Sequence, residues 1–293
     1  MDNTQRATHC LTQKSLVLTA ALLGASLVGA QTQPSPQQEK RFTSGSKPTV
    51  SVVNEYGPIA VHPGAGNVVV VRYVLHSDKV EVDTNQSGDR ITVESHLLAG
   101  ANSDAGQVDY EVLLPAGSNV MIHSNSGTLS AENLRGDISV EGAAALVDLR
   151  AISDGHLHVK TLSGNIMLLD IRQVHVVANT MSGDITMRNV DGPLVEVSSN
   201  NGKIHYDGDF GDSGSYKLSS HTGDIDASIP ANASVDVTAS SVKGQVDNDF
   251  PLLPKQHSIT VPDKGHSFVG IAGRAASSVL LRTFSGKIRL KQR

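Results

Sequence analysis

The sequence contains one cysteine, Cys10, among 293 residues. Cys10 lies close to the N-terminus, so a chain trimmed of its first residues could form no disulfide. Exported proteins often use disulfides, and small ones depend on them. A chain of this length can instead bury one substantial core. We therefore expect a fold that is stabilised by burial and backbone pairing alone.

Aromatic residues are also scarce, and neither sign of charge dominates. Aromatic residues make up 3% of the chain, and tryptophan is absent. Glycan-active enzymes and strong lectins usually present aromatic rings to sugars, so this scarcity argues against both classes. The net charge is −5 at pH 7. A mildly acidic chain is a poor general ligand for nucleic acid or anionic membranes, so we expect no nucleic-acid partner.

The apolar segment at residues 16–29 is too short to span a bilayer. Arg6 and Lys14 precede it, and the small residues Gly29 and Ala30 end it. This pattern is typical of a secretory signal peptide. We predict a signal peptide at 1–30 that is cleaved after Ala30, and an exported mature chain (periplasm, cell surface or secreted) without a transmembrane span. An uncleaved N-terminal anchor remains the alternative. Lipidation would need a cysteine just after the apolar segment, whereas Cys10 precedes it.

Residues 31–48, "QTQPSPQQEKRFTSGSKP", show no apolar period and are predicted to be a disordered linker. From Thr49 onward apolar and polar residues alternate between turns rich in Gly, Asn, Asp and Ser, which is typical of β-strands. We predict one all-β, adhesin-like β-repeat domain over 49–293. It begins with N-terminal strands at 49–118, and a repetitive region follows at 119–293.

The repeats share a short phrase that starts at a glycine. The phrase starts at Gly127, Gly136, Gly155, Gly164, Gly183, Gly202, Gly223, Gly244 and Gly286. The second residue after each glycine is Ile, Leu or Val, and strand residues two apart share a face. This places one column of side chains inward: Ile166, Ile185, Ile204, Ile225, Val246 and Ile288. It places Asp184, Lys203, Asp224 and Lys287 toward water.

The spacing of the glycines indicates stacking. Gly164, Gly183 and Gly202 recur at an interval of 19, the next two intervals are 21, and Gly286 lies at twice the longer interval beyond Gly244. A near-constant period is typical of stacked repeats that share one core. We therefore predict a repetitive parallel β-solenoid, or β-helix-like domain, in which Ile185 contacts Ile166 and Ile204. The last strand, at 287–293, is expected to cap the stack.

An antiparallel meander is the rival interpretation. Asn201-Gly202 is a strong signal for a two-residue hairpin. A hairpin there keeps the apolar residues on one face, so local patterning leaves both folds open. The constant period favours the solenoid.

Four segments carry a family resemblance: "VNEYGPIAV" (53–61), "DYEVLLPAGSNVMIHSNSG" (109–127), "NTMSGDITM" (179–187) and "VLLRTFSGKIRL" (279–290). In their order and number they resemble the bacterial putative adhesin domains of unknown function, which repeat "SGDI" strands. The resemblance covers about residues 49–290. It implies an exported β-solenoid-like domain with an adhesive or envelope role, and it supplies no catalytic residues. Residues 250–273 depart from the pattern, although Gly265 falls on the longer glycine interval, so the register of the last coil stays open.

Two constellations resemble metal ligands. His156 and His158 share a strand face and form a possible imidazole pair, but no third ligand follows from the sequence. Asp224 and Asp226 also share a face, and Asp247 should lie one coil away, which suggests an oxygen site for Ca²⁺. Exposed polar side chains are the favoured interpretation of both sets. We predict no catalytic, cofactor-binding or metal-binding residues and no cofactor.

Three functions fit these observations. The favoured one is an exported, non-catalytic module of the cell envelope or surface with an adhesive role, whose partner is another envelope protein or a surface polymer. The alternatives are a glycan-active enzyme on a β-helix and an envelope-stress sensor that acts through a partner.

Overall fold

The structure is a computed structural model, and it describes residues 36–255 and 264–293. The predicted signal peptide at 1–30, its cleavage after Ala30, and Cys10 lie outside the described residues. The described chain is all-β with one short 3₁₀ turn, η1 (Ser103–Ala105), so the predicted fold class is confirmed. Within the same ranges, no helix has the length and apolar character needed to cross a membrane.

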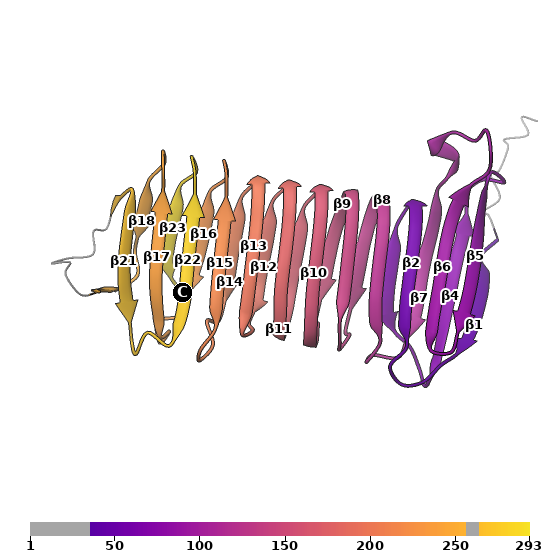
Figure 1. Cartoon of the computed structure of the whole chain (residues 1–293), viewed down its shortest axis with the longest axis horizontal. Helices are drawn as coiled ribbons and strands as arrows, with labels where there is room; N and C mark the ends of the chain where they lie inside the picture. The colour runs from indigo at the N-terminus through magenta and orange to yellow at the C-terminus, as the bar shows by residue number, and fades with distance from the viewer. Residues whose placement is uncertain (1–35, 256–263) are drawn as a thin grey trace, which may run out of the picture. The chain divides into compact units, whose positions relative to one another are not determined.

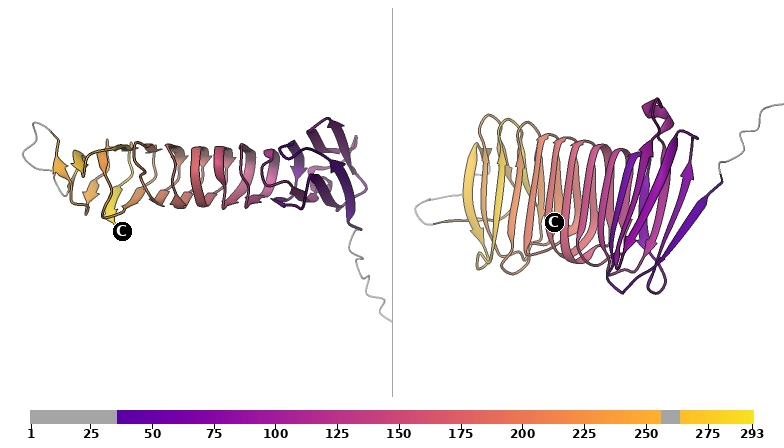
Figure 2. Two further views of the ribbon diagram at one scale, coloured as in Figure 1. Left: turned by 90° about the horizontal axis from the view of Figure 1, so that it is seen from below. Right: turned by 45° about the vertical axis from the view of Figure 1, so that its right-hand side comes forward.

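The chain winds as a stack of parallel coils, and each coil contributes a strand to each of two facing layers (Figures 1 and 2). Three long strands pass from one layer to the other: β8 (Asn119–Glu132), β9 (Ile138–Arg150) and β11 (Ile166–Ser182). The first layer continues with β2 (Thr49–Tyr56), β10 (Ser153–Ser163), β13 (Leu194–Asn201), β15 (Ser215–Ser220), β17 (Val235–Ser241) and β22 (Ser277–Thr283). The second layer contains β3 (Ile59–Pro63), β12 (Ile185–Val190), β14 (Ile204–Gly208), β16 (Ile225–Ile229), β18 (Val246–Asn248) and β23 (Ile288–Gln292).

Antiparallel strands extend both ends of the stack. At the N-terminal end they are β1 (Gln38–Thr43), β4 (Val68–Leu75), β5 (Val80–Ser87), β6 (Arg90–Leu97) and β7 (Val108–Leu114), where β6 is parallel to β2 and antiparallel to β5, and β7 is parallel to β3 and antiparallel to β4. At the other end β21 (Ser267–Ala272) pairs with β17 and with β19 (Leu253–Pro254), and β20 (Lys264–Gly265) pairs with β18.

Strand β1 lies inside the segment predicted to be a disordered linker, so that prediction is wrong for Gln38–Thr43. The strand pairs antiparallel with β4 along its whole length. Its side chains are mostly exposed and polar, which is why no apolar period marks it in the sequence. The backbone ladder and an ion pair between Arg72 and Glu39, with 2.9 Å between Nε and Oε2, hold it in place.

The core contains the predicted column of branched side chains. Ile185 is in register with Ile166 on one side and with Ile204 on the other, and all three are buried. Strand β13 pairs with β11 and β15 and shows no pairing with β14 among the described strands. The solenoid is therefore confirmed, and the hairpin at Asn201-Gly202 is wrong.

The corner glycines are required by close approach of neighbouring coils. A Cβ atom on Gly202 would lie 1.8 Å from the carbonyl oxygen of Gly183, and one on Gly223 would lie 1.7 Å from that of Gly202. Since neither residue has a positive φ, backbone conformation is not the reason. Serine and threonine hydroxyls reinforce this corner. Ser220 Oγ donates to the oxygen of Gly202 (3.0 Å) and accepts from the nitrogen of Gly223 (2.9 Å).

The order of coils along the stack departs from the order in the sequence. Ile288 of β23 is in register with Ile225 of β16 on one side and with Val246 of β18 on the other. β22 lies in the same way between β15 and β17, and Figure 1 shows these yellow strands between orange ones. The C-terminal strand is therefore internal, and the prediction that it caps the stack is wrong. The doubled interval between Gly244 and Gly286 suggested two further coils, whereas Gly244 stacks directly on Gly286.

We expect Ile185→Ala to lower the free energy of unfolding by about 2–4 kcal/mol, because it removes buried apolar surface and leaves a cavity between two coils. His158→Ala, on an exposed position of the first layer, should change it by less than about 0.5 kcal/mol. Urea denaturation followed by circular dichroism measures both. Equal losses in the two variants would contradict the inward column.

We expect Gly202→Ala to destabilise the protein by about 1–3 kcal/mol, because the added methyl group meets a carbonyl oxygen and the two coils must separate. Gly117→Ala is the matched control, since its Cβ would meet nothing closer than 3.5 Å. The control should be neutral or slightly stabilising. Thermal unfolding of both variants checks this, and a tolerant Gly202 would show that the coils are not closely stacked there.

Candidate functional site

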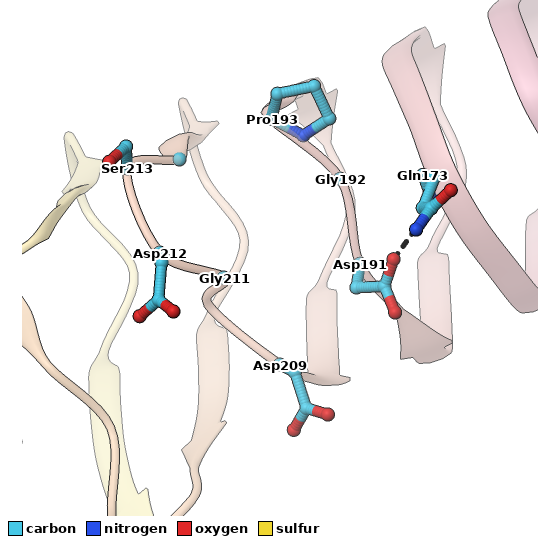
Figure 3. Close-up of a pocket in the computed structure, with 9 residues that line it drawn as sticks. Gln173, Asp191, Gly192, Pro193, Asp209, Gly211, Asp212 and Ser213 are labelled. Atoms are coloured by element: carbon cyan, nitrogen blue, oxygen red, sulfur yellow. Dashed lines mark hydrogen bonds between the residues drawn. The ribbon is translucent and has the colours of Figure 1, made fainter.

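A cleft lies at a corner of the stack that three successive coils form (Figure 3). It has a volume of about 520 Å³. Its lining comes from Gln173 within β11, from the connection between β12 and β13, and from the connection between β14 and β15. The lining residues are Gln173, Asp191, Gly192, Pro193, Asp209, Gly211, Asp212, Ser213 and Gly214.

The change in repeat length explains why the cleft is here. The interval from Gly202 to Gly223 is longer than the interval from Gly183 to Gly202. The β14–β15 connection, residues 209–214, lies within that longer interval. The loop forms one wall of the cleft. The longer glycine interval is the sequence signal that could have located the cleft, although the interval alone does not assign the added residues to a loop.

An aromatic cluster lies beneath the loop. The rings of Tyr206, Phe210 and Tyr216 have centroids 4.8–6.0 Å apart. The Tyr206 hydroxyl donates to the carbonyl oxygen of Val190 (2.9 Å) and the Tyr216 hydroxyl to that of Gly192 (2.8 Å). Burial raises the pKa of Tyr216 to about 12 and that of Tyr206 well above its usual value. Both hydroxyls therefore stay protonated over the physiological pH range, and the two rings support the loop from below.

A serine from the C-terminal coil, which β22 and β23 form, holds the loop from the other side. The Ser277 hydroxyl accepts from the nitrogen of Gly214 (2.9 Å) and donates to the oxygen of Gly211 (2.5 Å). Ser277 is 1% exposed. Because Ser277 lies in β22, the shape of the cleft depends on the C-terminal coil. No sequence pattern marks this dependence, since Ser277 and Gly214 are far apart in the chain.

The cleft is acidic, but its carboxylates do not converge on one point. Asp191 Oδ1 accepts from the Gln173 nitrogen (2.8 Å), and Asp209 Oδ1 accepts from Arg293 Nη2 (2.6 Å). Figure 3 shows the side chains of Asp191, Asp209 and Asp212 pointing to different regions of the cleft. Over residues 36–255 and 264–293, no group of three His, Cys, Asp or Glu side chains could hold a metal ion. Such a surface can accept hydrogen bonds from hydroxyl or cationic groups of a polar ligand.

The two histidines of the sequence analysis lie on the exposed face of β10. His156 contacts residues of neighbouring coils. Its Nδ1 lies 2.8 Å from Asp137 Oδ1, and its ring lies edge-on to that of His175 with 4.9 Å between centroids. The hydrogen bond from His156 holds the pKa of Asp137 below its usual value. The nearest partners therefore come from the stacking direction, whereas the sequence analysis paired His156 with His158 along the strand.

The three aspartates considered as possible Ca²⁺ ligands are engaged by basic residues of the C-terminal coil. Arg289 lies in register between Asp226 and Asp247. Its guanidinium donates to Asp226 Oδ1 (2.8 Å) and to Asp224 Oδ2 (3.1 Å). Asp247 forms an ion pair with Lys287. The expectation that Asp247 lies one coil from Asp226 is wrong, because the C-terminal coil separates them.

The sequence model described as "Toastrack DUF4097" matches residues 51–291. The chain belongs to the Toastrack family. This confirms the resemblance that the four segments carry. No curated protein matches the chain.

Solved structures similar to this Toastrack domain include a "putative adhesin" of Bacteroides fragilis, at 11% identity, over 88% of this chain and 98% of that chain, with a TM-score of 0.40. A "putative adhesin" of Parabacteroides merdae matches at 12% identity over 88% and 96%, with a TM-score of 0.34. A "putative cell adhesion protein" of Clostridium sporogenes matches at 12% identity over 89% and 100%, with a TM-score of 0.29.

The buried tyrosines beneath the loop should make the stability of the Toastrack domain depend on pH. Because the folded pKa of Tyr216 is raised from about 10 to about 12, its contribution to stability is present below pH 10 and is lost as pH rises toward 12. Tyr216→Phe should cost about 0.5–1.5 kcal/mol at pH 7, since a hydrogen bond is lost. The same variant should lose less stability than the parent between pH 9 and 11. Urea denaturation of the parent and the variant at pH 9 and pH 11 tests this. Equal losses of unfolding free energy in the two proteins would contradict it.

Proposed function

We propose that the protein is an exported, non-catalytic module of the cell envelope or cell surface that binds another macromolecule through the outer face of the first layer. One observation carries the proposal. Parallel coils in register bring outward side chains of successive coils into columns, which form a flat surface with repeated polar groups. Such a surface suits broad contact with many weak points of attachment. Export rests on the sequence pattern of residues 1–30 and on no structural observation.

The columns of the first layer are mixed in sign. In one column His123, Glu141 and Lys160 occupy adjacent strands. In another, Lys217 Nζ lies 2.6 Å from Glu196 Oε1. Alternating charge complements a polar protein or a surface polymer better than the uniform phosphate backbone of a nucleic acid. We therefore propose an envelope protein or a surface polymer as the partner.

A glycan-active enzyme is less well supported. Cleavage of a glycosidic bond needs two carboxyl groups about 5–10 Å apart that flank one bond. Two carboxylates of the cleft are instead engaged within the protein, Asp191 by the backbone nitrogen of Gln173 and Asp209 by Arg293. The aromatic rings there lie beneath the loop, with Tyr206 and Tyr216 buried, so they offer no platform for a sugar.

Binding of residues 31–293 to fractionated cell envelopes tests the proposal. Exposed ion pairs contribute about 0.2–1 kcal/mol each. Lys160→Glu with Lys217→Glu should therefore weaken binding several-fold by disrupting two columns of the first layer. Arg188→Glu with Lys291→Glu is the matched control, because it makes the same change of charge at exposed positions of the second layer.

The control should bind like the parent. Equal binding by both double variants would place the partner elsewhere and contradict the assigned face. Release of soluble sugar from the envelope fraction by the parent protein would contradict the non-catalytic assignment.

A further inference from the structure

The chain leaves the stack after β16 and returns to it in reversed order. Residues 230–234 link β16 to β17, but β17 pairs with β22 and β21. Among the described residues, no register joins β17 or β18 to β15 or β16. We refer to residues 235–293 as the C-terminal unit and to β1–β16 as the body. The unit is joined to the body by the ladders of β22 and β23 and by the short linker 230–234.

The two sides of this junction carry opposite charge. The body contributes Asp207, Asp209, Asp224 and Asp226, and the C-terminal unit contributes Lys287, Arg289 and Arg293. Arg293 Nη1 lies 3.0 Å from Asp207 Oδ1, and Nη2 lies 2.6 Å from Asp209 Oδ1. Arg289 bridges Asp224 and Asp226. The backbone nitrogen of Lys287 donates to Asp224 Oδ1 (2.8 Å). The junction therefore combines strand pairing with charge complementarity.

The same charges disfavour stacking of the coils in sequence order. Asp226 and Asp247 are each in register with Arg289. If β18 stacked directly on β16, these two carboxylates would lie side by side, and like charges in adjacent strands are destabilising. The edge of the body formed by β15 and β16 is therefore better matched by β22 and β23 than by β17 and β18. An open parallel edge readily accepts a strand from another chain.

The edge also makes specific contacts with the strand that fills it. The Thr283 hydroxyl donates to the Gly223 oxygen and accepts from the Gly286 nitrogen, both at 3.1 Å. The Phe284 ring stacks on His221 with 4.8 Å between centroids. The edge thus accepts a strand with a hydroxyl residue three positions before a corner glycine and with basic residues after it. The C-terminus of this chain has that sequence, and so does the C-terminus of every other copy.

We propose that the body of one molecule accepts the C-terminal unit of a second copy, so that two chains pair by exchanging residues 235–293 across linker 230–234. The exchanged junction can keep the strand pairings and ion pairs that join β22 and β23 to the body in the closed monomer. The paired molecules present two outer faces of the first layer. This pairing is independent of the partner assigned above, because its test does not involve that partner.

A charge-reversed pair of variants tests the exchange. In Arg289→Asp chains the unit repels its own body, and in Asp226→Arg chains the body repels its own unit. When the two variants are refolded together, exchange restores opposite charges at one junction and the parental pairing at the other. Light scattering after size exclusion should show a species of twice the monomer mass in the mixture and little of it in either variant alone. A mixture that stays monomeric would overturn the proposal.

Cross-linking tests the same exchange with variants that leave the ion pairs intact. Residues 31–293 contain no cysteine, and Ser219 is in register with Arg282 across the junction. Chains with Ser219→Cys are refolded with chains that carry Arg282→Cys, and a short bis-maleimide is added. A cross-linked dimer is expected. The control mixes Ser198→Cys with Ser219→Cys, which are in register inside the body and are not exchanged. A yield no higher than that of the control would overturn the proposal.

Discussion

Along one corner column the carbonyl oxygen of each glycine lies against the next glycine of the stack, and this contact fixes how closely these coils approach. The column contains Gly164, Gly183, Gly202, Gly223, Gly286 and Gly244. Because a methyl group at Gly202 would overlap the oxygen of Gly183, only glycine lets the backbones reach pairing distance at this corner. Once that distance is set, the strands on both sides pair in register. The register then places Ile185 between Ile166 and Ile204. Core packing and the surface columns therefore follow from one backbone contact.

The sequence predicts the regular part of this fold well, because there the period and the glycine contact report the same geometry. Ile166, Ile185 and Ile204 follow directly from it. Strand β1 could not be found in this way, because its side chains are polar and its stability comes from backbone pairing with β4. The position of β22 and β23 could not be found either. A period records the length of a coil and not the order in which coils stack. The alternation of Asp226, Arg289 and Asp247 across neighbouring coils agrees with the observed order.

The cleft illustrates a different limit. A lengthened repeat extends the loop at 209–214, and the period alone reveals the extension. The shape of the loop depends on the Tyr206, Phe210 and Tyr216 rings and on Ser277, which comes from a distant part of the chain. The candidate ligands of the sequence analysis share this limit. His156 meets Asp137 and His175 through stacking, so its surroundings depend on neighbouring coils and not on its own strand.

The antiparallel strands at the two ends have a consequence for the length of the molecule. A parallel coil left bare at either end would present the same edge as every coil inside, and further molecules could add to it as into a growing fibril. At the N-terminal end β5 and β4 reverse the direction of pairing, and β21 and β20 do so at the other. A coil that approaches these ends meets a ladder of the wrong polarity. The domain thus terminates its own repeat, and it remains a finite particle even though its interior is built as an extensible polymer.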